Sequence, residues 1–325
     1  MSSSRTVAQT LAACMLALTV ACAVAQQAYP VKPIRFIVPF PPGGSTDPMA
    51  RLAGQKLAES WSQQVIIDNR PGGNTIIGTE AAAKSPPDGY TILLTLNTHV
   101  LLPLLLPTPY DGIKDFAAIA TIASSEQILA AHPSLPANNL KELIALAKSR
   151  PGQLNYASSG SGTINHLASE FFNLVAGVQI QHIPYKGGGP ALTDLMAGQV
   201  QLHFNVPINL VPSAKSGKIK AIAVSGDKRL ASLPQVPTFA EAGLPGFEAR
   251  ASYWIFAPAG TPRQIIDKLS TEFAKITAMP DILEKLAGIG LEPFISNADQ
   301  LAALMKTESA KFAKIVKSAN IKLEN

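Results

Sequence analysis

Cysteine is nearly absent: the chain of 325 residues has two, Cys14 and Cys22, and both lie near its start. The first 25 residues have the features of a secretory signal peptide, because Arg5 is their single charge, residues 11–24 are mainly apolar and residues 23–25 are small. We therefore predict cleavage after residue 25. The exported chain would contain no cysteine, which excludes disulfides, thiol nucleophiles and cysteine metal ligands.

Long apolar runs are also lacking after this segment, so no later stretch is expected to cross a membrane. The run at 11–24 is itself shorter than the roughly 20 residues that a spanning helix needs, which favours a cleaved signal over a membrane anchor. A lipoprotein anchor is the remaining alternative, since Leu11–Cys14 resembles an acylation site, although it comes early in the run.

Charge and nucleotide motifs are sparse as well. Charged residues make up 15% of the chain, and its net charge of +5 falls to +4 when Arg5 is removed. Because there is no lysine or arginine cluster, nucleic acid is not an expected partner. No phosphate-binding G-x-x-x-x-G-K-[ST] or G-x-G-x-x-G motif occurs, and the five histidines show no zinc spacing. We therefore expect no cofactor and no metal.

The stretch that organises the rest of the chain is residues 34–48. An apolar run at 34–38 predicts a buried strand, and the prolines and glycines that follow end it abruptly. Asp47 stands where a helix N-cap is expected and Pro48 at the first helical position. A strand, a glycine turn and a helix start together gather unpaired N–H groups at one point, which can hold an anion without a cationic side chain.

Strand and helix patterns alternate along the whole chain, which predicts two α/β units with mixed sheets flanked by helices. Strands are expected at 34–38, 65–67, 91–95, 154–157, 178–184, 201–206, 219–225 and 253–256. Helices are expected at 48–60 and 78–84, after the Asn139 cap, after residue 163, between Pro190 and Gly198, from Pro262 and from Asn297.

Two further loops have the same chemistry as the first. Residues 158–163 and 185–189 each lie between a strand and a helix start and are rich in Gly, Ser or Thr, so they can cradle carboxylate oxygens. Asn97 and Asn205 stand at strand ends, where ligands gather in open α/β sheets. The candidate ligand-binding residues are Phe40, Gly43, Gly44, Ser45, Thr46, Asn97, Ser158, Ser159, Gly160, Gly162, Thr163, His166, Tyr185, Lys186, Gly187 and Asn205.

Several of these residues also have a purely structural interpretation. Asp47 is favoured as a helix cap over a catalytic acid because Pro48 follows it. His166 can reach a ligand or serve as a hydrogen-bonded structural histidine, and Lys186 can balance a carboxylate or lie in solvent. Phe40 and Tyr185, like Tyr253 and Trp254, suit either an aromatic wall or an ordinary core.

A secreted serine hydrolase is the enzyme alternative. It would use Ser159 or Ser161 with His166, but the 158–162 stretch lacks the first glycine of G-x-S-x-G. The sequence also places no acid nearby to orient the histidine, so we expect a binding protein and not an enzyme.

At these loops the sequence resembles a known family. Pro41–Arg51 resembles the P-G-G-x-x-D-x-x-A-R signature of the substrate-binding proteins of tripartite tricarboxylate transporters, the Bug family. Further segments similar to the family follow in order over nearly the whole exported chain. They are Asn69–Gly73, Leu154–Gly160, Pro184–Gly188, Pro237–Gly246 and Ala257–Pro262.

The resemblance implies a periplasmic receptor of the Venus flytrap type that closes around a small carboxylate and presents it to integral membrane transporter subunits. We expect the receptor to be a monomer. Lobe I would comprise residues 29–127 with 249–325, and lobe II residues 128–248. Loop amides, hydroxyls and water would hold the ligand. A ligand-loaded sensor that docks on a signalling ectodomain is an alternative that the receptor sequence leaves open.

The chain also departs from the family pattern. Tyr253–Phe256 replaces the family's S-W-x-G, and Gln201 and Asn205 stand near a strand end where an aspartate is common. Without that carboxylate an amino group lacks a partner, which disfavours amino acids. The resemblance and the neutral loops together favour a di- or monocarboxylate, with aromatic acids among the candidates.

Overall fold

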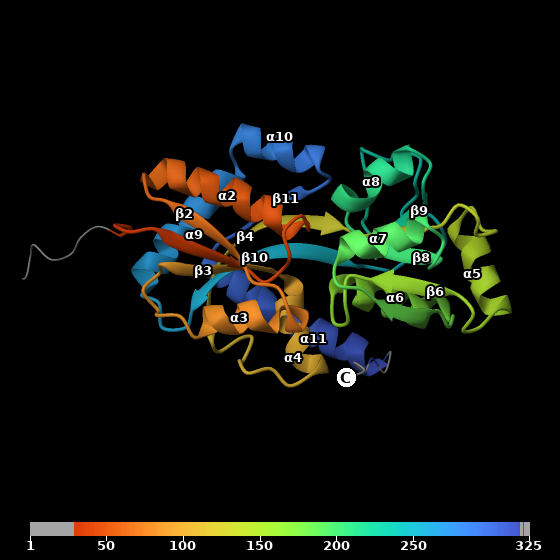
Figure 1. Ribbon diagram of the computed structural model, residues 1–325, viewed down its shortest axis with the longest axis horizontal. Coiled ribbons are helices and arrows are strands. Elements are labelled where there is room, and N and C mark those ends of the chain that lie inside the picture. The colour runs from red at the N-terminus through yellow and green to blue at the C-terminus, as the bar shows by residue number, and fades with distance from the viewer. Residues whose placement is uncertain (1–28, 319–320, 322–325) are drawn as a thin grey trace, which may run out of the picture.

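The computed structural model describes residues 29–318 and residue 321, so the predicted signal peptide and both cysteines lie outside the described residues. The described chain forms two mixed sheets flanked by helices, and Figure 1 shows them as two lobes along the long axis of the molecule. The predicted fold class, a two-lobed α/β protein, is confirmed.

Lobe I is built on a six-stranded sheet with the order β11-β4-β10-β3-β1-β2. β1 is parallel to β2 and β3, whereas β10 is antiparallel to β3 and β4. Its strands are β1 (Ile34–Val38), β2 (Val65–Asn69), β3 (Thr91–Leu96), β4 (Phe116–Glu126), β10 (Arg250–Pro258) and β11 (Glu292–Ser296). Its helices are α2 (Thr46–Trp61), α3 (Ile76–Ala83), α4 (Leu102–Leu105), α9 (Arg263–Thr277), α10 (Pro280–Gly288) and α11 (Ala298–Ser318), with short 3₁₀ turns η1 (Gly73–Thr75) and η2 (Asn97–Val100).

Lobe II is built on a five-stranded sheet with the order β7-β6-β8-β5-β9. β6 is parallel to β7 and β8, and β5 is antiparallel to β8 and β9. Its strands are β5 (Ile128–Ala131), β6 (Asn155–Ser158), β7 (Gln181–Pro184), β8 (Leu202–Asn205) and β9 (Lys220–Val224). Its helices are α5 (Leu140–Ser149), α6 (Ile164–Ala176), α7 (Gly188–Met196) and α8 (Pro207–Lys215).

The chain passes between the lobes at two adjacent places. β4 ends at Glu126 and β5 of the other sheet begins at Ile128, whereas the return path follows β9 and enters β10 at Arg250. Arg250 is the antiparallel register partner of Glu126, so the two crossings lie side by side. An apolar core fills lobe I, and apolar clusters on lobe II pack around β5, β6 and β8.

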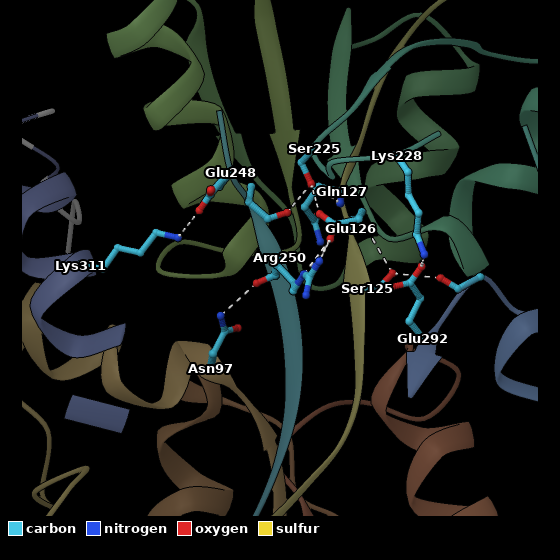
Figure 2. A network of polar contacts seen from close by, with 12 residues as sticks. Asn97, Ser125, Glu126, Gln127, Ser225, Lys228, Glu248, Arg250, Glu292 and Lys311 are labelled. Carbon is cyan, nitrogen blue, oxygen red and sulfur yellow. Dashed lines mark hydrogen bonds and ion pairs between the residues drawn. The ribbon is translucent and has the colours of Figure 1, made fainter. Parts of the chain in front are cut away.

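A network of polar contacts, shown in Figure 2, ties these crossings together. The Glu126 carboxylate lies 2.6 Å from the Arg250 guanidinium and 2.8 Å from Ser225 Oγ on the other crossing. Beside them, Lys228 pairs with Glu292 of β11 at 3.0 Å, which joins the lobes. The side chain of Glu126 is 12% exposed, so these partners replace most of its contacts with water.

A local signal in the sequence explains the start of α5, but two other predicted helix starts differ from the structure. Asn139 caps α5, because its Oδ1 accepts a hydrogen bond from the amide of Glu142, as the capping pattern predicts. The predicted start at Pro190 is wrong: α7 begins two residues earlier, at Gly188, and Pro190 is in its first turn. In that turn the missing N–H of proline costs nothing, because the first amides of a helix lack intrahelical acceptors.

The prediction that Asp47 is an N-cap is also wrong. α2 begins at Thr46 after an Ser45 N-cap, and Asp47 lies in the first turn. Its carboxylate pairs with Arg51 one turn later, at 3.1 Å, and lies 3.5 Å from the amide of Gly43. Burial alone would raise the pKa of Asp47, but hydrogen bonds from Arg51 and Asn69 outweigh burial and lower it. Asp47 therefore stabilises the glycine turn through its contacts with Gly43 and Arg51.

Candidate ligand-binding cleft

A cleft of about 1050 Å³ lies between the lobes and is lined by loops from both of them. Lobe I contributes the turn after β1, the turn after β2 and the end of β3, and lobe II contributes the loops before α6, α7 and α8. Of the predicted site residues, those that line this cleft are Phe40, Gly43, Gly44, Ser45, Thr46, Ser159, Gly162, Thr163, Tyr185, Lys186, Gly187 and Asn205. The other four, Asn97, Ser158, Gly160 and His166, are not among its lining residues.

Five helices begin at this cleft. Their N-cap residues all line it, and none of the five forms a side-chain capping bond; they are Ser45 of α2, Thr75 of α3, Thr163 of α6, Gly187 of α7 and Val206 of α8. First-turn amides lack intrahelical acceptors, and the helix dipole places partial positive charge at the same end. The cleft thus concentrates N–H donors and positive potential from both lobes, which favours an anionic ligand.

Side-chain charge in the cleft is limited to one residue. Lys186 is the single charged residue among those that line it, and no aspartate or glutamate is present there. An anion therefore meets no repelling carboxylate on the lining, whereas an amino group would find no carboxylate partner. The cleft lining therefore suits a ligand whose oxygen atoms accept hydrogen bonds from mainly uncharged donors.

The loop at 158–163 is held in shape from beneath. Ser158 is fully buried, and its Oγ accepts a hydrogen bond from the amide of Gly160 at 3.2 Å and lies 2.6 Å from His182 Nε2. His166 Nδ1 accepts a hydrogen bond from the amide of Gly162 at 3.2 Å. The amides of Gly160 and Gly162 are thus already used within the protein. Ser158 and His166 position the loop and do not face the cleft.

The loop at 185–189 packs directly against the first one. The amide of Gly187 donates to the carbonyl of Ser159 at 3.1 Å, with a φ of 114° that only glycine adopts without strain. A Cβ atom at Gly188 would lie 2.8 Å from Asn205 Nδ2 and 3.3 Å from Ser159 Oγ. Glycine at 188 allows the Asn205 and Ser159 side chains to approach its backbone, and a larger residue would displace Asn205.

Aromatic and amide side chains of the cleft are partly committed to internal contacts. The hydroxyl of Tyr185 donates to Asp194 at 2.8 Å, and burial together with this carboxylate raises the pKa of Tyr185 to about 12. Asn205 Oδ1 accepts from the amide of Val206 at 2.8 Å, and its Nδ2 lies 2.9 Å from His203 Nε2. Both residues present their remaining surface to the cleft.

The hydrogen bonds of Asn97 hold it away from the cleft. Asn97 is the first residue of η2, directly after β3 ends at Leu96. Asn97 Nδ2 donates to the carbonyl of Arg250 at 3.0 Å, on the crossing side (Figure 2). Its neighbour Thr98 lines the cleft instead.

The sequence reasoning missed one complete wall of the cleft. Residues 71–75 line it, and Asn74 and Thr75 have φ values of 52° and 80°, in the left-handed region. The signal was present as a glycine turn after the second strand, but it was not included in the predicted site. A Cβ atom at Gly160 would lie 3.5 Å from Asn74 Oδ1, so loops of opposite lobes approach closely. Ile208 and Asn209 of α8 were missed as well.

The arrangement offers no exposed nucleophile with a partner base among the described residues of the cleft. Two serine–histidine contacts occur among the described residues: Ser158 with His182, where the serine has no exposed surface, and Ser134 with His132, neither of which lines the cleft. His166, the base of the hydrolase alternative, has its Nδ1 engaged by Gly162. No group of three or more metal-ligating side chains occurs in the described part of the chain, and no described helix is long and apolar enough to span a membrane.

Residues 49–321 match the family described as the tripartite tricarboxylate transporter family receptor. The chain belongs to this family. The curated relatives include Protein BugT of Bordetella pertussis (strain Tohama I / ATCC BAA-589 / NCTC 13251), which is 36% identical over 308 residues that make up 94% of each chain. The family is one of solute-binding receptors.

Solved structures of two further proteins resemble the chain over most of its length. R. palustris Rpa4515 with adipate is 35% identical, with a TM-score of 0.86, covering 90% of this chain and 99% of that one. MatC (Rpa3494) from Rhodopseudomonas palustris with bound malate is 31% identical, with a TM-score of 0.81, covering 89% of this chain and 100% of that one.

Proposed function

We propose that this receptor binds a small organic carboxylate in the cleft between its lobes. The observation that carries the proposal is the convergence of five uncapped helix N-termini on a cleft whose lining holds Lys186 and no acidic residue. Such a surface stabilises carboxylate oxygens through backbone donors. The adipate and malate in the related structures support the same ligand class.

The two lobes act as the halves of a trap. Lobe I comprises residues 29–127 and 249–325 and lobe II residues 128–248, with the crossings at Glu126 and Arg250 as the hinge. A ligand that contacts donor loops of both lobes binds the closed form more tightly than the open form and so favours closure. The receptor releases its acid unchanged to the membrane subunits of a tripartite tricarboxylate-type transporter. It works as a monomer in the periplasm, where receptors of this family reside.

Calorimetric titration of the purified protein with carboxylates, sugars and amines tests the proposal. We expect carboxylates alone to bind, and we expect them to raise the melting temperature because they bind the folded state. Binding of sugars or amines in place of acids would overturn it.

Lys186→Gln tests whether the one charge of the cleft contributes. Loss of a charge-assisted contact should weaken carboxylate binding by about tenfold. Lys148→Gln, on the exposed last turn of α5, is the matched control and should leave the affinity unchanged.

A further inference from the structure

The end of the cleft nearest the crossings is apolar. Five of its lining residues there form a surface that we call the apolar floor: Leu96, Ile164, Val206, Ile208 and Ala251. All five belong to or pack against one apolar cluster, which is the core of lobe I. The floor is thus continuous with a packed interior, although two of the contributing helices, α6 and α8, come from lobe II.

Strand ends place these residues next to the hinge. Ala251 follows Arg250, the register partner of Glu126, and Val206 follows Asn205, the register partner of Ile128. The floor therefore lies where both crossings meet the cleft. The glycine-rich donor loops, by contrast, stand at the helix starts of α2, α3, α6 and α7. The start of α8 offers fewer donors, because Pro207 has no N–H and the amide of Asn209 donates to the Val206 carbonyl at 3.1 Å.

Polar groups beside the floor have little capacity left for a ligand. Both ends of the Asn205 amide are engaged, by the Val206 amide and Asn209 on the oxygen and by His203 on the nitrogen. Three further polar side chains line the cleft beside the floor. Asn165 Nδ2 donates to the carbonyl of Phe204 at 2.7 Å, Asn209 Nδ2 donates to Asn205 Oδ1 at 3.0 Å, and Thr98 has 8% of its surface exposed. A ligand hydroxyl on this surface would lose its hydrogen bonds to water and would face mainly carbon atoms.

That exchange sets a preference between otherwise similar acids. A methylene group gains from contact with the floor, whereas a hydroxyl loses its hydrogen bonds to water without replacement. Hydrophobic pockets reject an added hydroxyl by a factor of about 10 to 100. The effect acts on the carbon body of the acid, since the carboxylate itself is held by the donor loops.

We propose that the receptor selects acids whose carbon body carries no hydroxyl group, with the body lying on the apolar floor and the carboxylate among the donor loops. This selectivity rests on the proposed function, because it assumes that a carboxylate occupies the cleft. The cleft volume of about 1050 Å³ leaves room for a ring or a chain of several methylene groups.

Matched pairs of acids that differ by one hydroxyl test the selectivity by calorimetric titration. Succinate is compared with malate, and phenylacetate with mandelate. The expected result is binding at least tenfold tighter for the member without the hydroxyl in each pair that binds. Equal or tighter binding of malate and mandelate overturns the selectivity and leaves the proposed function standing. If no carboxylate of any kind binds, the proposed function fails together with it.

Val206→Thr locates the selectivity on the floor. Threonine has nearly the shape of valine, adds one hydroxyl, and is a favourable N-cap for α8, so we expect the variant to fold. The affinity ratio within each pair should fall by about tenfold. Val200→Thr, at a buried position of lobe II that does not line the cleft, is the control and should leave the ratio unchanged. An unchanged ratio in Val206→Thr would overturn the assignment to the floor.

Discussion

The imidazole rings of His166 and His182 stack beneath the donor loop at 158–163, with centroids 4.1 Å apart and planes 20° apart. Each ring holds part of that loop, since His166 Nδ1 accepts from the amide of Gly162 and His182 Nε2 contacts Ser158 Oγ. A ring nitrogen that accepts a hydrogen bond must be unprotonated. The loop shape therefore depends on a neutral His166, with His182 packed against it.

Acid is expected to destabilise the protein through this pair. Burial, with a contribution from His182, lowers the pKa of His166 to about 3, and burial lowers that of His182 to about 4. In the unfolded chain both would titrate near 6.5, so below that pH the unfolded state binds more protons. With respect to these two histidines, the free energy of unfolding has its full value above pH 6.5. It should fall as the pH is lowered from about 6.5 to 4, by about 1.4 kcal/mol per pH unit for each such histidine.

Urea unfolding of His182→Gln at a series of pH values separates the contribution of His182 from that of the other histidines. Glutamine keeps a hydrogen-bonding group for Ser158 but does not titrate. The slope of the free energy of unfolding against pH, below pH 6.5, should therefore decrease by about the contribution of one histidine. His99 and His203, whose pKa values burial lowers to about 4, continue to contribute to the slope. Glu170, which accepts from Tyr156 next to the pair, acts oppositely because burial raises its pKa. An unaltered slope would contradict the prediction.

Gly188→Ala is expected to weaken ligand binding more than it affects folding. The new methyl group would lie 2.8 Å from Asn205 Nδ2, so Asn205 must move, whereas alanine suits the first turn of α7. We expect about tenfold weaker carboxylate binding and a melting temperature within a few degrees of the parent. Gly189→Ala is the matched control, because nothing lies within 4 Å of its added Cβ. Equal affinities of the two variants would show that Asn205 is not displaced.

Glu126→Gln is expected to lower the free energy of unfolding by about 1 to 2 kcal/mol. The substitution keeps the shape of the side chain but removes its ion pair with Arg250, which is half exposed and therefore partly compensated by water. Glu80→Gln breaks the ion pair with Lys84 on the surface of α3, and we expect it to cost at most about 0.5 kcal/mol. Urea unfolding of both variants compares them; equal losses would contradict a special role for the crossing.

The fold followed from local patterns that have clear physical causes. The strand at 34–38 and the Asn139 cap were predicted because an apolar run and an Asx–Glu spacing act over a few residues. β11 and α10 were not predicted. β11 alternates intermediate and exposed positions, so it lacks a strong apolar signal and is specified by pairing with β4.

The site was predictable to the level of loops but not of single atoms. The sequence indicated that the three glycine-rich turns hold an anion, and the structure brings all three to one cleft. It could not indicate which of two neighbours faces the cleft, Asn97 or Thr98 and Ser158 or Ser159, because these residues lie at or just beyond strand ends, where tertiary hydrogen bonds set the side-chain direction. His166 points at the loop and away from the cleft because its Nδ1 accepts a hydrogen bond from the amide of Gly162. The sequence does not show that contact.

The antiparallel pairing of Arg250 with Glu126 means that the whole second lobe starts and finishes at a single point of the first. Such a segment is a natural unit of exchange, because its two junctions need not be stretched to receive a different insert. We expect that swapping this segment between related receptors yields chimeras that fold, with each lobe keeping its own half of the specificity.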